Sequence, residues 1–349
     1  MIKVAVSGIN AAENPGPGVG IIRSLKESRL NVRTIGLAYD AMEPGIYLDH
    51  LIDKSYILPY PSGDVNSFIE RIKYINSIEK LDIIISTLDA ELPVYMDIEN
   101  NLLNDGIKML IPTKKMFSLR NKTNLKPLAE SIGLKTPDYV SCTSIGDLHQ
   151  IIPKIGLPCM IKGPFYEAFK ANSTAEAEGF FNKLAAKWGY PIVVQEFING
   201  QEYDVIGCGD GMGNDLGLFA IKKMTTTSLG KVWNAVSIVN EKLIETSKTL
   251  LSHLKWRGGF ELEVLIDLKT EDIYLIEINP RFPAWVYMAS ACGINLPERM
   301  VCLLLDKKYE NHSNYQNGKI MIRYTNEIMK DISDLEKITS YGELENNPL

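Results

Sequence analysis

The pattern of hydrophobic and polar positions divides the chain into two parts of different character. In residues 1–112, short apolar runs alternate with segments of mixed polarity, and the run Leu81–Ser86 is apolar almost throughout. A run of this kind is typical of a strand that is buried on both faces of a parallel sheet. We therefore predict a doubly wound α/β layer in which strands and helices alternate along the chain. The expected strands are Ile2–Val6, Val32–Leu37, Leu81–Ser86 and Leu110–Pro112, and the expected helices are Ile21–Ser28 and Ser67–Ile78.

After Pro112 the pattern changes to that of an α+β fold with mostly antiparallel strands. Strand-like runs follow one another with short turns between them, and we expect the last two to form a hairpin. The tail beyond about Tyr341 is polar, which is typical of a mobile chain end. The expected helices are Lys114–Ile132, Ala175–Trp188 and Glu241–His253, and the expected strands are Pro158–Lys162, Pro191–Phe197, Glu202–Cys208, Leu216–Lys223, Lys231–Ser237, Gly259–Asp267 and Ile273–Ile278.

Composition limits the classes of function that the chain can serve. Of its 349 residues, 45% are apolar and 23% are charged, a balance that excludes a disordered or coiled-coil chain. The formal net charge of −6 argues against nucleic acid or an anionic membrane as the main partner. Five cysteines without a CxxC pair argue against a zinc site and favour a reducing, cytoplasmic compartment. The first residues are typical of a strand rather than a signal peptide, and no apolar run approaches the ~20 residues of a membrane helix.

The clearest candidate for chemistry is the end of the expected hairpin. Glu277 and Asn279 are two residues apart on its second strand, so alternation places them on the same face. Glu263 lies on the partner strand, and a turn near Lys269–Asp272 would bring it opposite them. Two carboxylates and an amide oxygen are hard ligands that suit Mg²⁺, and Arg281 follows them as a candidate anion-binding residue. The alternative is that these charges line a solvated face.

Two weaker signals lie upstream of the hairpin. Lys162 ends an expected strand and is followed by Gly163, so it is a candidate point charge for a phosphate group. The alternative is a strand-end lysine whose ammonium group reaches water. The segment Val193–Gln201 is apolar and then polar around a turn, and Glu202 follows it. The backbone of this segment is a candidate partner for the edge of an adenine.

Taken together, these residues resemble the motifs of the ATP-grasp enzymes. The matching residues are, in chain order, Lys122, Lys162, Gln195-Glu196-Phe197-Ile198, Glu202, Glu263 and Glu277-Ile278-Asn279-Pro280-Arg281. The resemblance is strongest to the biotin carboxylase and carbamoyl-phosphate synthetase large-subunit branch, and it covers roughly residues 1 to 325. It implies an N-terminal pre-ATP-grasp domain over residues 1–112 and a two-lobed ATP-grasp module. The small lobe would be residues 113–190, and the large lobe with the C-terminal tail would be residues 191–349.

The resemblance also implies a role for each matching residue. It assigns Lys122 and Lys162 to the ATP phosphates, Glu196, Phe197 and Ile198 to adenine, Glu202 to the ribose, Glu263, Glu277 and Asn279 to two Mg²⁺ (or Mn²⁺) ions, and Arg281 to the γ-phosphate or the acyl phosphate. Arg281 and Lys162 are thus the expected catalytic residues.

The chain departs from the family pattern in the loop after Lys162. The family usually carries a glycine-rich flap there, whereas Gly163–Ser173 contains one glycine and several bulky aromatic residues. Because glycine lets backbone N–H groups approach phosphate closely, this loop must cover a nucleotide differently. Lys170 is a candidate for the missing positive charge, unless the stretch is an ordinary helix start. Of Lys222 and Lys223, alternation allows only one to face the site, and we expect Lys222.

Asp89 and Glu91 are candidates for binding the second substrate. They follow the buried strand that ends at Ser86, at the edge where open α/β sheets bind ligands. We expect them to bind an amine or cation of the substrate, and capping of the next helix is the alternative. The glycines after the first strand do not have the spacing of a dinucleotide-binding loop.

The resemblance implies a cytoplasmic, magnesium-dependent ligase that uses ATP. Such an enzyme activates a substrate carboxylate as an acyl phosphate, which an amine captures with release of ADP and phosphate. Two alternatives stay open: an ATP-grasp carboxylase or kinase reaction, and a nucleotide-binding regulatory protein that has lost catalysis. The expected partners are a small carboxylate and a small amine, with no nucleic acid and no membrane. A homodimer is left open by the sequence.

Overall fold

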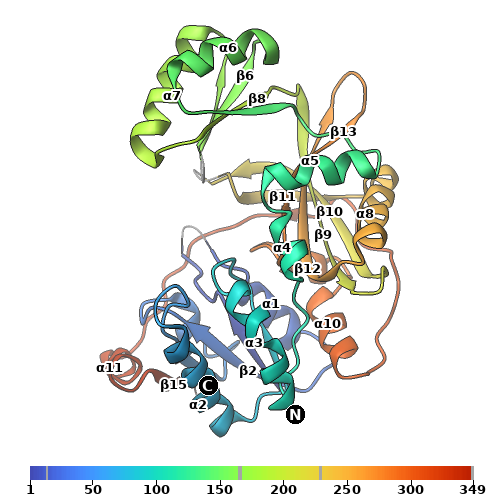
Figure 1. The fold of residues 1–349 in the computed structure, drawn as a ribbon. Helices are drawn as coiled ribbons and strands as arrows, with labels where there is room; N and C mark the ends of the chain where they lie inside the picture. Colours follow the sequence, from blue (N-terminus) through green and yellow to red (C-terminus); the bar gives the residue numbers. More distant parts are fainter. Residues whose placement is uncertain (13–14, 164–166, 228–229, 347–349) are drawn as a thin grey trace.

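The strands of the described residues form three sheets (Figure 1). The computed structural model describes residues 1–12, 15–163, 167–227 and 230–346, with the backbone alone described for residues 122–123. In Figure 1 the five-stranded sheet lies at the bottom, the six-stranded sheet in the middle and the four-stranded sheet at the top. The polypeptide therefore builds a base with two further lobes above it.

The five-stranded sheet is parallel except at one edge, and its strand order is β15-β3-β2-β1-β4. Successive residues of β1 face opposite sides: Val4 and Val6 pack against α1, and Ala5 packs against α2 and α3. Helices thus cover both faces, and the prediction of a doubly wound layer is confirmed. The elements are β1 (Ile2–Ser7), α1 (Gly18–Lys26), β2 (Val32–Ala38), η1 (Pro44–Tyr47), β3 (Lys54–Ile57), α2 (Val65–Glu79), β4 (Ile83–Ile85) and α3 (Leu92–Asn104).

The expected strand at Leu110–Pro112 is wrong. Among the described residues of this segment, the only pairing with the parallel sheet is an isolated bridge between Lys108 and Ile83 of β4. Leu110 and Ile111 are apolar because they are buried where the chain passes to the next domain, and the Leu110 carbonyl approaches the backbone of Gly258 closely. The apolar run therefore reflects packing between domains rather than strand pairing.

The C-terminal segment returns to the first domain, which corrects the expected mobile tail. Helix α11 (Ile332–Tyr341) leads into β15 (Glu343–Glu345), and β15 pairs antiparallel with β3 at the sheet edge. Leu344 is buried, and Lys54 Nζ lies 2.9 Å from Glu343 Oε2. The polar residues of this tail are thus partners of charges on the sheet, so its polarity does not indicate a free end.

The small lobe contains the four-stranded antiparallel sheet, with the order β5-β8-β6-β7. Ser144 and Asp147 form a capping box at the start of α6, which satisfies N–H groups that the helix leaves free. The apolar core of this lobe is made of residues 142–194 alone. Its elements are β5 (Tyr139–Cys142), α6 (Ile145–Ile155), β6 (Cys159–Lys162), β7 (Ala168–Ala171), α7 (Thr174–Trp188) and β8 (Ile192–Glu196).

The large lobe contains the six-stranded antiparallel sheet, with the order β13-β12-β9-β10-β11-β14. One face packs against α5 and α8 through residues such as Val205 and Leu262; we call it the back face. The other, the front face, carries Ile206 and Phe219 against the segment that includes α9 and α10. The elements are α4 (Lys114–Ser118), α5 (Lys122–Ser131), β9 (Gly200–Asp210), β10 (Asp215–Thr226), β11 (Val232–Ile238), α8 (Glu241–Leu254), β12 (Arg257–Asp267), β13 (Ile273–Asn279), α9 (Tyr287–Ala291), α10 (Leu296–Leu304) and β14 (Ile320–Met321).

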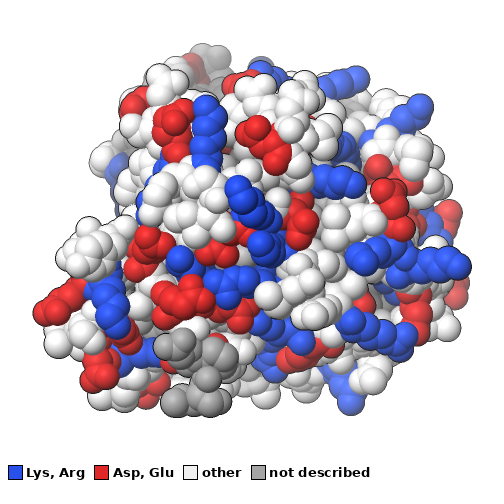
Figure 2. Space-filling view, turned by 90° about the horizontal axis from the view of Figure 1, so that it is seen from below, with Lys and Arg blue, Asp and Glu red and all other residues white. Residues whose placement is uncertain are grey.

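Charges of both signs are interspersed on the face of the molecule seen from below (Figure 2). Within the described part of the chain, the helices lack the length and the apolar composition that a membrane span requires.

Candidate functional site

The expected metal-binding residues share the front face of the six-stranded sheet. The β12–β13 register pairs Glu263 with Glu277 and Glu261 with Asn279, and the β12–β9 register pairs Glu263 with Asp204. Residues that lie directly opposite across antiparallel strands project to the same side. The face therefore carries the three predicted residues and two further carboxylates. Sequence reasoning missed Glu261, although it is two residues before Glu263 in the same alternation.

Asn279 joins two of these carboxylates. Its Nδ2 donates to Glu261 Oε2 at 2.9 Å and to Glu263 Oε1 at 3.2 Å, and the indole N–H of Trp285 donates to Glu261 Oε1 at 2.7 Å. Burial and the neighbouring charge of Glu263 raise the pKa of Glu261 to about 7. The negative charges of Glu261 and Glu263 thus repel each other, and a cation bound between them would relieve that repulsion.

Lys223 is the buried cation of this face. Its Nζ lies 2.7 Å from Glu263 Oε2, 3.3 Å from Asp204 Oδ1 and 3.6 Å from Glu202 Oε2. The side chain is only 6% exposed. Burial alone would lower the pKa of Lys223, but the charges of Asp204 and Glu263 raise it well above its usual value. Lys223 is therefore a charged counter-ion for the carboxylates.

The expectation that Lys222 faces the site is wrong. Lys222 pairs with Tyr203, whose side chain packs against the cluster of the back face. Lys223 is one residue further along the pleat, so it projects to the front. The sequence showed that only one of the two could face the site, but the choice depends on the register of β10 against β9.

The donor set of the front face fits a hard divalent cation. The candidate ligands are oxygen atoms, and the fully buried Asp204 carboxylate has only the Lys223 ammonium, 3.3 Å from Oδ1, as a partner among the described residues. No three His, Cys, Asp or Glu side chains in that part of the chain are gathered tightly enough to bind a metal without rearrangement. Instead, the Lys223 ammonium lies among the carboxylates. Oxygen ligands beside an excess of negative charge match the preference of Mg²⁺.

The residues expected to hold adenine lie where β8 leaves the small lobe for β9. The backbone N–H of Glu196 donates to the Asp138 carbonyl at 2.7 Å, and Glu196 Oε2 accepts from the Asp138 N–H at 3.1 Å. Ile198 is buried. The Lys170 ammonium lies 3.9 Å from the ring centroid of Phe197, a cation–π contact that brings positive charge to this segment.

The expected phosphate-binding lysines lie in two different elements. Lys162 ends β6, and its partners in the sheet are Val193 of β8 and Ala168 of β7. Lys122 is the first residue of α5, and its side chain lies outside the described residues. After Lys162 the chain forms a strand, β7, so the helix start considered for the stretch around Lys170 is wrong. Part of the glycine-poor loop, residues 164–166, also lies outside the described residues.

Arg281 and Asp89 meet between the first domain and the large lobe. Arg281 Nε lies 3.4 Å from Asp89 Oδ1, and Arg120 Nη2 lies 3.6 Å from Asp89 Oδ2. Partial burial and the positive charge of Arg281 lower the pKa of Lys231, which the charges of Asp89 and Glu261 oppose. Asp89 thus lies beside the residue predicted to bind the transferring phosphoryl group.

Glu91 lies at the expected edge of the parallel sheet, and its side chain is buried there. It is fully buried, and its carboxylate accepts hydrogen bonds from Ser7 Oγ at 2.6 Å, from Ser86 Oγ at 2.8 Å and from the Tyr39 hydroxyl. Its side chain does not cap α3 either. Glu91 therefore ties the ends of β1, β2 and β4 together.

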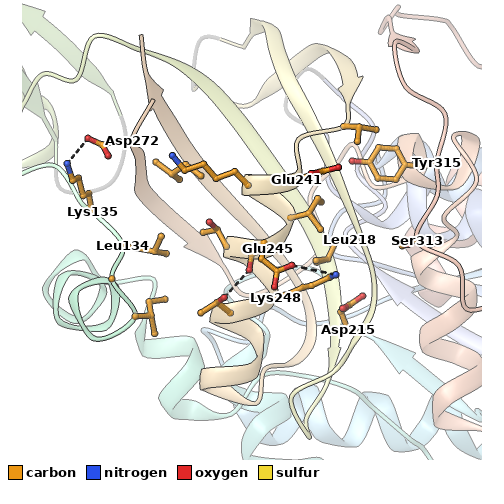
Figure 3. Close-up of a pocket in the computed structure, with 18 of the residues that line it drawn as sticks. Leu134, Lys135, Asp215, Leu218, Glu241, Glu245, Lys248, Asp272, Ser313 and Tyr315 are labelled. Carbon is orange, nitrogen blue, oxygen red and sulfur yellow. Dashed lines mark hydrogen bonds and ion pairs between the residues drawn. The ribbon is translucent and has the colours of Figure 1, made fainter. Parts of the chain in front are cut away.

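A pocket of about 1100 Å³ lies on the back face, around α8 (Figure 3). Several of its charged groups are already paired: Lys135 Nζ with Asp272 Oδ2 at 2.6 Å, and Lys248 Nζ with Glu245 Oε2 at 3.8 Å. None of the carboxylates of the front face lines it. The pocket is thus separated from the candidate site by the sheet itself.

Comparison with known proteins identifies the fold that carries this site. Residues 190–328 match a family model described as ATP-grasp in the biosynthetic pathway with Ter operon. The chain is 25% identical over 228 residues to the carbamoyl phosphate synthase large chain of Pyrococcus furiosus. It is 28% identical over 188 residues to the formate-dependent phosphoribosylglycinamide formyltransferase of Methanocaldococcus jannaschii. The biotin carboxylase–β,γ-ATP complex from Campylobacter jejuni matches with a TM-score of 0.67 and 18% identity, over 89% of this chain and 72% of that chain.

These similarities are partial along the sequences of the relatives. The two curated relatives are matched over 59% and 50% of this chain, but over 20% and 44% of their own lengths. The chain thus spans less than half of each. The resemblance to the ATP-grasp enzymes and the expected fold class are confirmed.

Proposed function

We propose that this chain joins a substrate carboxylate to an amine at the expense of ATP, because it has the ATP-grasp fold and its sequence is similar to those of ATP-grasp ligases. The observation that carries the proposal is the front face. There Asn279 donates hydrogen bonds to both Glu261 and Glu263, and Glu277 lies opposite Glu263 in the strand register. Arg281 follows two residues after Asn279, and it is near enough for its positive charge to act on Glu261.

In the proposed reaction, the carboxylate oxygen attacks the γ-phosphorus and the bond from the γ-phosphorus to the β–γ bridging oxygen breaks. ADP leaves with the electron pair, and an acyl phosphate remains. The amine then attacks the acyl carbon, the bond from carbon to the phosphate oxygen breaks, and the amine proton passes to solvent or phosphate. Neither step needs a protein nucleophile.

The side chains of the site have separate tasks in this proposal. Glu261, Glu263, Glu277 and Asn279 would hold magnesium, which neutralises charge on the triphosphate when bound. Arg281 would bind the transferring phosphoryl group and the acyl phosphate as a bidentate donor. Lys162 would bind phosphate from the small lobe, and the segment around Phe197 and Ile198 would hold adenine. Enclosure between the lobes would keep water from the acyl phosphate.

The free and buried state of all five cysteines supports a reducing compartment, and we place the protein in the cytoplasm.

The test is ADP formation with hydroxylamine as the amine, because hydroxylamine captures acyl phosphates as hydroxamates. A panel of carboxylates is supplied with Mg-ATP, and hydroxamate is measured beside ADP. At least one carboxylate should give both products in equal amounts, and Glu277→Gln should lower the rate about 100-fold or more. The control is Glu245→Gln on α8, an exposed carboxylate of the back face.

Two results would contradict the proposal. Nucleotide binding without ADP formation for any carboxylate would favour a regulatory protein. ADP formation without hydroxamate, dependent on bicarbonate, would favour a carboxylase.

A further inference from the structure

Asp89 offers a hydrogen-bond acceptor that the protein does not satisfy. Its Oδ1 is buried and accepts no hydrogen bond from any described residue, although Arg281 Nε is 3.4 Å away. Its Oδ2 lies 3.6 Å from Arg120 Nη2. Because a buried acceptor without a donor costs free energy, a donor from a ligand would stabilise this group.

Arg281 offers donors that the protein does not use. Its side chain is 16% exposed, and its guanidinium donates one long hydrogen bond, from Nη1 to the Phe282 carbonyl at 3.4 Å. Apart from the ion pair of Nε with Asp89, its other N–H groups donate to no acceptor among the described residues. Lys231 is close enough for the charge of Arg281 to lower its pKa. An anion bound to Arg281 would therefore lie immediately beside a carboxylate oxygen that accepts no hydrogen bond from the described residues.

We propose that the acid substrate is an α-amino acid, bound with its carboxylate on Arg281 and its ammonium group on Asp89. The inference rests on the proposed function and specifies the substrate of that same site. An α-amino acid carries its two charges on one carbon, and Asp89 and Arg281 present opposite charges 3.4 Å apart. The ligand's ammonium group therefore meets the Asp89 carboxylate, and its carboxylate meets the Arg281 guanidinium. The carboxylate to be phosphorylated would thus lie on Arg281, the residue proposed to bind the phosphoryl group.

Simpler ligands leave part of this arrangement unpaired. A carboxylic acid without an amine would place its charge beside Asp89 and would leave Oδ1 without a donor. A simple amine would place a third positive charge beside Arg281 and Lys231. Since like charges at this distance repel, the pair selects a ligand that carries both signs.

The test compares amino acids with their desamino analogues in the hydroxamate assay. The matched pairs are L-alanine and propionate, L-glutamate and glutarate, and L-phenylalanine and 3-phenylpropionate, and the remaining common amino acids are screened alongside. We expect at least one amino acid to be used about tenfold or more better than its analogue, measured as kcat/KM. Asp89→Asn should remove most of that preference and leave the KM for ATP unchanged.

The matched control is Asp97→Asn, an aspartate of α3 whose partner is Lys114 at the surface. It should keep the wild-type preference. The comparison of analogues uses the wild-type protein, so it decides the question even if the Asp89 variant does not fold.

Three results would overturn the inference. Equal use of both members of every pair is one, and an unchanged preference in Asp89→Asn is another. The third is hydroxamate formation from carboxylates that lack an amine while no amino acid reacts. These results leave the proposed ligase reaction standing, whereas failure of every carboxylate to give hydroxamate would remove both.

Discussion

At the scale of single residues, Lys223 is the cation around which the front face is organised. Three carboxylates lie within 3.6 Å of its ammonium group, and Asp204 among them is fully buried. We predict that Lys223→Met lowers the free energy of unfolding by about 3 kcal/mol, because removal of one partner leaves buried charge uncompensated. MgCl₂ should restore part of the loss, since the cation can replace the ammonium charge. Urea unfolding in MgCl₂ and in NaCl of equal ionic strength measures both effects.

The control for this prediction is Lys222→Met, on the back face of the same strand. It should change stability little and should show no specific response to magnesium. An equal response of both variants to MgCl₂ and NaCl would contradict a magnesium site at this face.

Glu91 gives a prediction about pH. Burial raises its pKa above the ordinary value of 4.5, while hydrogen bonds from Ser7, Tyr39 and Ser86 oppose the shift. A carboxyl group whose pKa is higher in the folded state holds its proton more tightly there. The contribution of Glu91 to stability is therefore greatest below about pH 4.5 and falls as the pH rises through the folded-state value. Glu91→Gln lacks this component, so the free energy of unfolding of wild type minus that of the variant should fall as the pH rises above about 4.5, as measured by unfolding curves across pH.

The same variant separates a structural role from a substrate role. Because Glu91 is fully buried, Glu91→Gln should leave the KM values for both substrates unchanged. A variant with normal stability and a strongly raised KM would instead support the expected role of Glu91 in substrate binding.

At the scale of elements, β15 shows how a short strand is fixed by distant residues. Leu344 is buried at the edge beside β3. We predict that Leu344→Ala lowers the free energy of unfolding by about 2–5 kcal/mol, the usual cost of removing a buried leucine side chain. It should also speed amide exchange in β3. Tyr341→Ala, at a residue whose side chain is largely exposed, is the control and should stay within about 0.5 kcal/mol of wild type.

The sequence predicted the elements whose signals are local. The buried strand near Ile83–Ile85 and the hairpin of β12 and β13 have continuous apolar or alternating patterns, and both exist. The strands β3, β7 and β15 have three or four residues each, and no expected strand corresponds to them. Such short runs carry too little periodicity, and β15 is a strand only because β3 supplies its partner.

The same distinction applies to the candidate site. Glu277 and Asn279 share a face by alternation within one strand, so the sequence was sufficient to pair them. The choice of Lys223 over Lys222 and the position of Asp204 depend on the register between β9, β10 and β12. That register is set by packing across the whole sheet, so the pattern of residues along one strand cannot predict it.

At the scale of the whole molecule, the small lobe is a separate packing unit. Its apolar core draws on residues 142–194 alone, and Figure 1 shows it standing above the other two sheets. Among its links to neighbouring parts are an ion pair between Lys126 and Asp138 at 2.5 Å and the strand connection from β8 to β9. A unit with its own core and few contacts outside it can move as a rigid body when a ligand contacts both it and the neighbouring lobe.

We therefore predict that a non-hydrolysable ATP analogue with magnesium closes the small lobe onto the large one. The radius of gyration from small-angle X-ray scattering should decrease, because Lys162 in the small lobe and the carboxylates of the front face would hold the same triphosphate. Lys162→Ala should bind the analogue more weakly and should lose the compaction at concentrations that saturate the wild type. Lys183→Ala, on α7 of the same lobe, is the control and should close normally. If the wild type binds the analogue tightly with no decrease in radius, the two lobes do not share the nucleotide, and the assignment of Lys162 to its phosphates is wrong.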